Sequence, residues 1–334
     1  MKREDTKRAL IIMPKFYSYA DAISKELTSR EYEVDLFYEE PSAFYFLIMR
    51  KISRLLKTNF LYSFFCQSIY RKIIAKQHKY DVFLLIRGNI LQPSFIEKIK
   101  TNCLNEGAKT VYYTWDSFKY LEHKGILANL FDEKFTFDTA NIEVDKTWKL
   151  LPLFYTNSFN ADRIQRDDTT IKYDVCCVAS YNSERCQFLQ NFIKRHPSLK
   201  TKIALYIDKK IYDIKIKSDK ILQGTNPSWL IFSYIPAKEV AQINLSSKAI
   251  LDYTDSFQSG LSMRTIESIG LRKKLITNNK AIMKYDIYNT NNIYLTTGNC
   301  FIPKEWFQTD YKQQEDVRFK YSLAFWIDTI LKNK

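Results

Sequence analysis

The sequence lacks the short motifs that usually mark phosphate, metal or nucleophile chemistry. It contains no G-x-G-x-x-G, no Walker loop, no H-E-x-x-H and no Gly-x-Ser-x-Gly, so a standard dinucleotide site, a P-loop, a zinc protease site and a hydrolase elbow are unsupported. No Asp-x-Asp pair could hold a divalent ion on a nucleotide diphosphate. The three histidines, at 78, 123 and 196, are too scattered for a histidine-rich metal site. We therefore expect no resident metal and no cofactor.

Long apolar runs, glycine and paired cysteines are also scarce. Seven glycines and eight prolines leave little material for flexible linkers. No run reaches the roughly 18 apolar residues of a membrane-spanning helix, and the apolar run 9–13 is too short for a secretory signal. The six cysteines form no C-x-x-C pair, and a long, core-rich chain does not need a disulfide framework. These absences predict a cytoplasmic protein with reduced thiols.

The composition that is present indicates a globular protein with an anionic partner. Hydrophobic residues make up 46% of the 334 residues, which excludes wholesale disorder and favours about two domains. The 51 basic residues outnumber the 37 acidic ones and give a net charge of +14. Such a charge favours nucleic acid, a phosphorylated ligand or an anionic membrane as the partner.

The order of apolar runs predicts two α/β halves. Short strand-like runs alternate with helical stretches in the first half, at 9–13, 32–38, 81–86, 110–115 and 131–137. The segment 150–155 contains Pro152 and has no helical period, so it is predicted to link the halves. Strands are predicted again at 173–179, 201–207, 249–252, 274–277 and 292–295, with helices starting near Ser94 and Ser262 and a terminal helix over 311–331. Open α/β sheets bind ligands at the carboxyl ends of their strands.

The segment 252–277 carries the most chemical information. A strand ends near Asp252, a polar loop with Gly260 follows, and a helix begins near Ser262. The N-terminus of that helix offers N–H groups to a phosphate, and Arg264 adds a fixed positive fork. Glu267 lies about one turn on, where its carboxylate could accept hydrogen bonds from a ribose diol. The other interpretation is a capping arrangement, with Ser262 or Thr265 as the cap and Glu267 as an acid of the first turn.

The same segment resembles a known family. The pattern Gln258-x-Gly260-Leu-x-Met263-Arg264-Thr265-x-Glu267-x-x-Gly270-x-x-Lys273-Lys274-Leu-Ile-Thr277 resembles the donor motif of bacterial GT-B glycosyltransferases. It is most similar to those of lipopolysaccharide or capsule assembly, including the CgeB-like group. The resemblance continues at 285–288, 291–293, 113–117, 137–138 and 151–155.

The resemblance implies a fold, a reaction and a set of site residues. The fold would be α/β with two Rossmann-like domains facing a cleft: an acceptor-side domain over 1–150, a donor domain over 151–315, and a C-terminal helix over 316–334 that crosses back to the first domain. The donor would be a nucleotide-sugar, the acceptor a glycan or lipid-linked saccharide, and the chemistry metal-independent. The donor residues would be Ser180, Arg185, Ser259, Gly260, Leu261, Ser262, Met263, Arg264, Thr265 and Glu267. The sequence departs from the family at 14–16, where Pro-Lys-Phe replaces the usual small residues.

Two further segments offer functional side chains. The loop 180–185 could grip the diphosphate with a backbone nest and Arg185, or be an ordinary turn with Ser183 as the helix cap. Asp116 ends a strand of the first half and could act as the general base on an acceptor hydroxyl. The alternative for Asp116 is the N-cap of a following helix. Asp138 and His123 are weaker candidates for the base.

The stretch 41–80 is basic and apolar and contains no acidic residue. Such a stretch can lie in a membrane interface and bind anionic lipid, which would make the protein peripheral on the inner face of the cytoplasmic membrane. The alternative is a helix pair packed on the first domain with a solvated basic face. Nucleic acid is not favoured, because no recognised fold or motif supports it. A function from another class also stays open, that of a non-catalytic basic α/β protein binding a phosphorylated polymer or nucleic acid.

Overall fold

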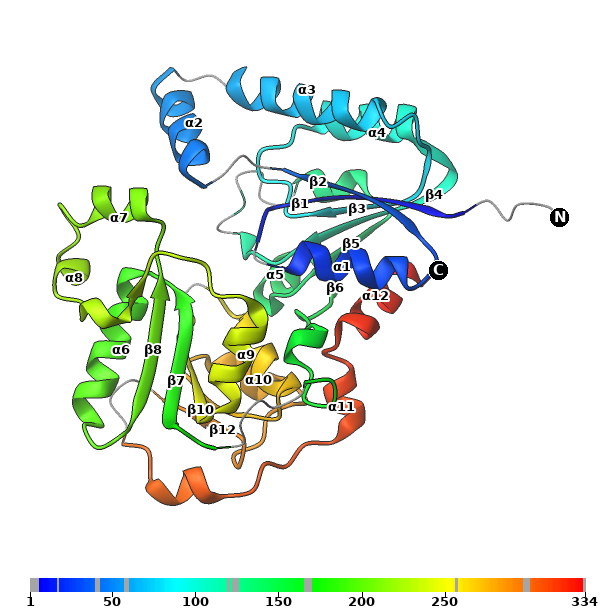
Figure 1. The fold of residues 1–334 in the computed structure, drawn as a ribbon. Coiled ribbons are helices and arrows are strands. Elements are labelled where there is room, and N and C mark those ends of the chain that lie inside the picture. Colours follow the sequence, from blue (N-terminus) through cyan, green and yellow to red (C-terminus); the bar gives the residue numbers. More distant parts are fainter. Residues whose placement is uncertain are drawn as a thin grey trace. The chain divides into compact units, whose positions relative to one another are not determined.

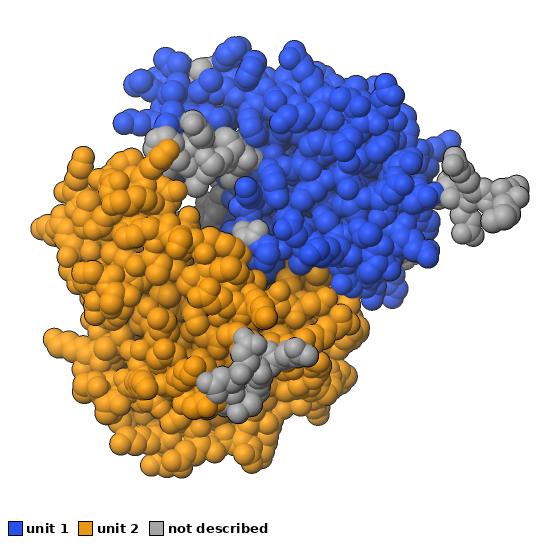
Figure 2. Space-filling view, in the orientation of Figure 1, with its two compact units in different colours: residues 1–152, 327–334 blue, residues 153–326 orange. Residues whose placement is uncertain are grey.

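The computed structural model of the chain divides into two compact units. It describes residues 6–16, 18–39, 43–56, 60–118, 121, 126–164, 170–255, 258–296 and 301–332. Unit 1 comprises residues 1–152 and 327–334, and unit 2 comprises residues 153–326 (Figure 2). Each unit contains its own six-stranded sheet, so each has an independent hydrophobic core.

The sheet of unit 1 has the order β2-β1-β3-β4-β5-β6 and is parallel throughout (Figure 1). Its strands are β1 (Arg8–Met13), β2 (Glu33–Tyr38), β3 (Tyr80–Ile86), β4 (Leu104–Thr114), β5 (Glu133–Thr136) and β6 (Lys149–Leu150). The buried stretches 9–13 of β1, 82–86 of β3 and 111–113 of β4 are continuously apolar, because helices cover both faces of a parallel sheet. All carboxyl ends of the strands therefore lie at one edge of the sheet.

The helices of unit 1 are α1 (Tyr19–Thr28), α2 (Ala43–Leu56), α3 (Phe60–Ile74), α4 (Pro93–Cys103) and α5 (Thr139–Val144), with the 3-10 helix η2 (Ile126–Leu130). Helix α1 buries Ala20, Ile23 and Leu27, which is the spacing of one helical face. Helices α3 and α4 pack together and contribute side chains to the core of unit 1. The end of the chain belongs to this unit, where Arg30 forms an ion pair of 2.8 Å with Asp328.

The sheet of unit 2 has the order β12-β11-β10-β7-β8-β9 and is also parallel. Its strands are β7 (Tyr173–Ser180), β8 (Thr201–Tyr206), β9 (Leu230–Ile231), β10 (Ser247–Asp252), β11 (Lys274–Thr277) and β12 (Ile293–Leu295). The prediction of two α/β halves with parallel sheets is confirmed.

The helices that follow these strands are α6 (Ser183–Arg195), α7 (Lys209–Lys215), α8 (Lys220–Gln223), α9 (Ala237–Leu245), α10 (Met263–Gly270), α11 (Glu315–Phe319) and α12 (Leu323–Leu331). Short 3-10 helices are η3 (Asn157–Phe159), η4 (Pro227–Trp229), η5 (Lys280–Lys284) and η6 (Lys304–Gln308). Gly270 lies where α10 meets η3: a Cβ there would lie 2.3 Å from the carbonyl oxygen of Phe159. Only glycine permits this approach.

The prediction of the terminal helix is wrong in detail. The single helix expected over 311–331 is two helices, because Tyr155 N–H donates to the Tyr321 carbonyl at 2.8 Å and Leu323 N–H donates to the Tyr155 carbonyl at 3.0 Å. These main-chain bonds to the linking segment interrupt the helical pattern. The helix predicted to start near Ser94 is confirmed: α4 begins at Pro93, with Gln92 at the N-cap position and no side-chain cap. Proline suits the first helical position because it has no N–H to satisfy.

Two further observations concern thiols and membrane spans. The described cysteines, at 66, 103, 176, 177 and 186, are buried free thiols, and Cys300 lies outside the described residues. Within the described part of the chain, no helix has the length and apolar character needed to cross a bilayer.

Candidate functional site

In unit 2, three neighbouring strands end beside one another. Strand β10 pairs in parallel with β7 on one side and with β11 on the other. The described residues that follow them are 181–182 after β7, 253–255 and 258–262 after β10, and 278–279 after β11. Because parallel strands end at one sheet edge, polar side chains from distant parts of the sequence meet here.

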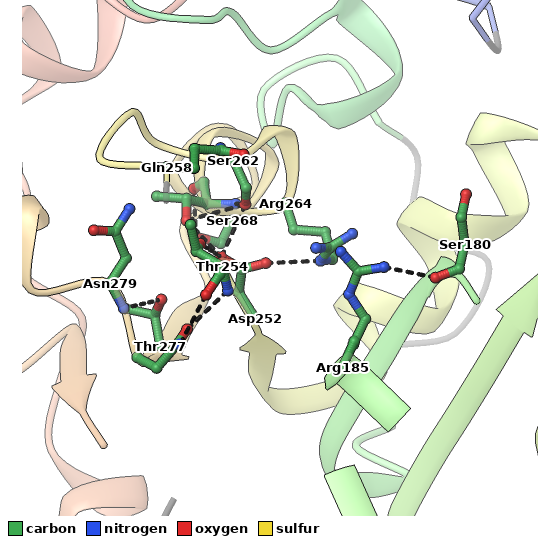
Figure 3. A network of polar contacts seen from close by, with 12 residues as sticks. Ser180, Arg185, Asp252, Thr254, Gln258, Ser262, Arg264, Ser268, Thr277 and Asn279 are labelled. Atoms are coloured by element: carbon green, nitrogen blue, oxygen red, sulfur yellow. Dashed lines mark hydrogen bonds and ion pairs between the residues drawn. The ribbon is translucent and has the colours of Figure 1, made fainter. Parts of the chain in front are cut away.

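Asp252, the last residue of β10, is the centre of this polar network (Figure 3). Its side chain is fully buried. Its Oδ1 accepts a hydrogen bond from Arg264 Nε at 2.8 Å, and its Oδ2 accepts one from Ser262 Oγ at 2.9 Å. The hydroxyls of Thr254 and Thr265 lie within 3.2 and 3.3 Å of the same oxygen. A buried carboxylate is tolerated because a cation and several donors compensate its lost hydration.

Asp252 fixes the orientation of Arg264. The carboxylate holds Nε, the guanidinium nitrogen nearest the main chain, so the terminal nitrogens lie beyond it. Burial alone would lower the pKa of Arg264, but Asp252 and Glu267 raise it and keep the group charged. In Figure 3 the guanidinium group of Arg264 points toward that of Arg185.

Arg185 reaches the same place from the first turn of α6. Its Nη1 donates to the Ser180 carbonyl at 2.6 Å, and its main-chain N–H donates to the side chain of Asn182 at 3.0 Å. Both arginines affect the pKa of one buried thiol, that of Cys177. Burial raises this pKa, and the positive charges of Arg264 and Arg185 partly oppose the rise. Both positive charges therefore act near Cys177, and an anion bound beside both guanidinium groups would neutralise them.

The loop between β10 and α10 is held by the residues after β11. Asn278 Oδ1 accepts a hydrogen bond from Thr254 N–H at 2.8 Å, and its Nδ2 donates to the Thr254 carbonyl at 2.8 Å. Asn279 Nδ2 donates to the Gly260 carbonyl at 3.1 Å, while Asn279 Oδ1 caps η5. Tyr253 OH donates to Glu184 Oε2 at 3.0 Å and so connects this loop to α6. The site is braced from both neighbouring strands.

The predicted donor residues fall into different environments. Ser262 is the N-cap of α10 and accepts a hydrogen bond from Thr265 N–H at 3.2 Å, as the capping interpretation expected. Gly260, Leu261 and Thr265 are buried, whereas Ser259 and Met263 are half-buried. Two residues of the loop, 256 and 257, lie outside the described residues.

Two expectations about this site are wrong. Glu267 is not an acid of the first turn, as the capping interpretation had it, because α10 begins at Met263 and Glu267 lies beyond that turn. Its side chain is buried. Ser183 does not cap α6; Asn182 does, and Ser183 Oγ donates to Asp219 Oδ2 at 2.7 Å. The sequence analysis also missed Asp252, Asn182 and Asn279 as organising residues. The available signal was their position, because each follows or ends a predicted strand.

A second polar group lies at the carboxyl edge of the unit 1 sheet. Glu39 is fully buried and accepts hydrogen bonds from Arg87 Nε at 2.6 Å and from Asn89 N–H at 2.9 Å. Arg87 follows β3 with a φ of +73°, a left-handed conformation that is unusual for a residue other than glycine. Its Nη1 lies 3.8 Å from Asp116 Oδ2. Burial raises the pKa of Asp116 and Arg87 opposes the rise.

The candidate bases therefore differ sharply. The carboxylate of Asp116 stays partly exposed, at 36%, and the residue does not cap a helix in the described part of the chain. Asp138 is fully buried, caps α5 through a bond from Ala140 N–H at 3.1 Å, and accepts a bond from Ser117 Oγ. Both carboxylate oxygens of Asp138 therefore accept hydrogen bonds from neighbouring residues of unit 1, which argues against a role as the base. His123 lies outside the described residues. Among the described residues, no group of three His, Cys, Asp or Glu side chains is arranged to hold a metal ion.

Comparison with solved structures places both units in a known fold. The chain matches a glycosyltransferase from Rickettsia africae over 99% of its own length and 100% of that chain, at 10% identity and a TM-score of 0.57. It matches MurG of Acinetobacter baumannii over 97% and 98% of the two chains, at 10% identity and a TM-score of 0.51. It also matches a UDP-GlcNAc 2-epimerase from Neisseria meningitidis over 98% and 100%, at 11% identity and a TM-score of 0.51.

No family model and no curated protein matches the sequence. At these low identities the structural matches establish the fold alone. The chain has the two Rossmann-like domains of GT-B proteins, a fold that serves both glycosyltransferases and an epimerase among its neighbours. Function must be argued from the site.

Proposed function

We propose that this chain is a glycosyltransferase that takes its sugar from a nucleotide-activated donor bound at the carboxyl ends of β7, β10 and β11. The observation that carries the proposal is the pair of guanidinium groups, Arg264 and Arg185, directed toward each other above two adjacent strand ends. Arg264 is held by a buried carboxylate and cannot turn away without losing that bond. Such preorganisation is what a site for a leaving diphosphate requires.

The chemistry proposed is metal-independent. As the bond between sugar and diphosphate breaks, negative charge develops on the leaving phosphate. Arg264 and Arg185 would neutralise that charge, and the N–H groups in the first turn of α10 would add hydrogen bonds and a favourable dipole. Ser180 and the segment 259–265 would shape the pocket around the donor. Glu267 would accept from the ribose diol; its burial beside Arg264 means that this contact requires a donor seated deep in the site.

The acceptor side belongs to unit 1. We propose Asp116 as the general base if the reaction inverts the anomeric centre, because it is the partly exposed acid at the sheet edge and its pKa is raised. A base with a pKa closer to neutral is a better proton acceptor at working pH. The acceptor would be a glycan or a lipid-linked saccharide of lipopolysaccharide or capsule assembly, as in the CgeB-like group. The enzyme would then work at the inner face of the cytoplasmic membrane of a bacterium.

A thermal-shift screen against UDP, GDP, CMP, dTDP and their sugars tests the donor site. We expect one nucleotide to raise the melting temperature, since a ligand that binds only the folded state stabilises it. The hit should then be incubated as its sugar conjugate, and release of the free nucleotide measured. Stabilisation without release, with and without extracted glycolipid, would favour the non-catalytic binding protein. No stabilisation by any of these nucleotides would refute the donor site.

A further inference from the structure

Helices α2 and α3 of unit 1 expose large apolar side chains along one stripe each. On α2 the exposed apolar residues are Ile48, Ile52, Leu55 and Leu56; Ile52 lies four residues after Ile48, and Leu55 and Leu56 lie three and four residues after Ile52. On α3 they are Phe60, Phe64 and Ile74. Leu55 is 80% exposed and Phe64 66%, which is far from the usual state of such residues in a globular domain.

The opposite stripe of α3 is the one that faces the core. Tyr62, Cys66, Ile69 and Ile73 are buried, and the last three belong to the core of unit 1. Cys66 Sγ lies 3.6 Å from the Ile90 carbonyl, and α3 packs against α4 (Figure 1). Helix α3 therefore has two apolar faces: one packs in the core of unit 1, and the other is exposed.

Positive charge accompanies these apolar side chains and negative charge does not. Lys51 on α2 and Arg71 and Lys72 on α3 are exposed, and the whole stretch 41–80 contains no Asp or Glu. Lys76 and Lys79 are committed elsewhere, to Asp35 at 3.1 Å and to the Asn102 carbonyl at 2.9 Å. A protein partner of this surface would need a face that is both acidic and apolar. An anionic bilayer offers negative headgroups and an apolar interior over its whole surface.

We propose that the exposed stripes of α2 and α3, defined by Lys51, Leu55, Leu56, Phe64, Arg71 and Lys72, form a surface that binds anionic phospholipid bilayers. The apolar side chains would enter the headgroup region while the basic ones contact lipid phosphates and carboxylates. Leu55 and Leu56 lie at the end of α2 and Phe60 lies at the start of α3, with exposed fractions of 80%, 62% and 68%. We expect these side chains to enter the bilayer deepest. The basic side chains of α3 follow along the same helix.

The two components predict a specific salt dependence. Each basic residue close to an anionic surface strengthens binding about fivefold, so three of them account for roughly a hundredfold. This component fades as the screening length falls from about 10 Å at 0.1 M salt to about 3 Å at 1 M. The apolar component does not depend on salt in this way. Wild-type protein should therefore lose most, but not all, of its binding in high salt.

Sedimentation with vesicles of phosphatidylglycerol and phosphatidylcholine, against pure phosphatidylcholine, tests the proposal. Three proteins are compared with the wild type: Lys51→Gln/Arg71→Gln/Lys72→Gln, Leu55→Gln/Leu56→Gln/Phe64→Gln, and the control Lys217→Gln/Lys238→Gln/Lys304→Gln. The control removes the same charge from exposed lysines of unit 2. We expect the basic variant to bind anionic vesicles about a hundredfold more weakly, the apolar variant to lose the salt-resistant part, and the control to bind like the wild type.

Several results would overturn the proposal. One is wild-type protein that stays in solution with anionic vesicles; another is a control variant that loses as much binding as the basic variant. A third is a wild-type dimer that the apolar variant abolishes while vesicle binding is unaffected, because the surface would then be an interface between copies. All replaced side chains are exposed, so the variants should melt with the wild type. Nucleotide stabilisation measured in parallel keeps a failure here separate from a failure of the donor site.

Discussion

The most informative single change in the donor site is Asp252→Asn. Asparagine has nearly the same size as aspartate, so the packing around the side chain does not change. The substitution removes the negative charge and one of the two acceptor oxygens. Arg264 then has a neutral amide in place of its counter-ion, and the hydroxyls of Ser262, Thr254 and Thr265 converge on an NH2 group that donates rather than accepts.

The structure sets the size of the effect. Removing one partner of a fully buried ion pair costs about 3–5 kcal/mol. Arg264 retains 17% exposure, so water can partly hydrate it, and the amide oxygen can still accept one bond. Mismatched hydroxyl bonds add about 1 kcal/mol. We expect a loss of about 3 kcal/mol in the free energy of unfolding of unit 2, together with weaker nucleotide binding because Arg264 is no longer held in place.

Urea unfolding followed by circular dichroism measures this loss, with Asp310→Asn as the control at an exposed acid. The control should change stability by less than about 0.5 kcal/mol. The double variant Asp252→Asn/Arg264→Met, compared with both single variants, isolates the pairwise energy, for which we expect about 2 kcal/mol. A stable Asp252→Asn protein, or a coupling energy near zero, would refute the view that this carboxylate organises the site.

Three further outcomes are expected. Gly270→Ala should destabilise the protein by about 2 kcal/mol or more, because the new Cβ would lie 2.3 Å from the Phe159 carbonyl oxygen. The control is Gly224→Ala, whose Cβ would lie 3.6 Å from its nearest neighbour and which should melt like the wild type. Burial alone would raise the pKa of Asp35, but hydrogen bonds from His78, Tyr80 and Lys76 outweigh burial, so the net pKa is lowered. The stabilisation that Asp35→Asn removes should therefore be present above about pH 4 and disappear as the pH falls through the lowered pKa. A difference in unfolding free energy between wild type and variant that grows in acid would contradict this sign. Sugar-nucleotide turnover should survive EDTA, and a complete loss that manganese or magnesium restores would point to metal-dependent chemistry.

Strands were the easier part of the structure to predict from the sequence. Runs such as 9–13, 82–86 and 249–251 are continuously apolar because both faces of each sheet are covered, and their order alone indicates two α/β units. The terminal helix was mispredicted because its break at Tyr321 and Ser322 depends on main-chain bonds to Tyr155, a partner more than 150 residues away. No local pattern records such a contact.

The position of the segment 258–265 at a strand end was predicted, but the contacts that hold its side chains were not. The residues 258–265 lie at the expected strand end, yet what fixes Arg264 is Asp252, which the sequence offers only as the last residue of a strand. The capping alternative put Glu267 in the first helical turn because the sequence was also compatible with a helix that begins after Thr265, whereas α10 begins at Met263. Polar residues recruited from β11, such as Asn279, become visible only once the strand order is known.

Titration of the nucleoside diphosphate selected by the screen into wild type, Arg185→Gln and the control Lys238→Gln tests the donor site most directly. Arg185 is a better target than Arg264, because Arg264 forms an ion pair with the fully buried Asp252 and its loss would itself destabilise unit 2. We expect Arg185→Gln to weaken the Kd at least tenfold, about 1.4 kcal/mol, and the control to bind like the wild type. A folded Arg185→Gln protein with wild-type affinity would contradict the assignment of the diphosphate to this site.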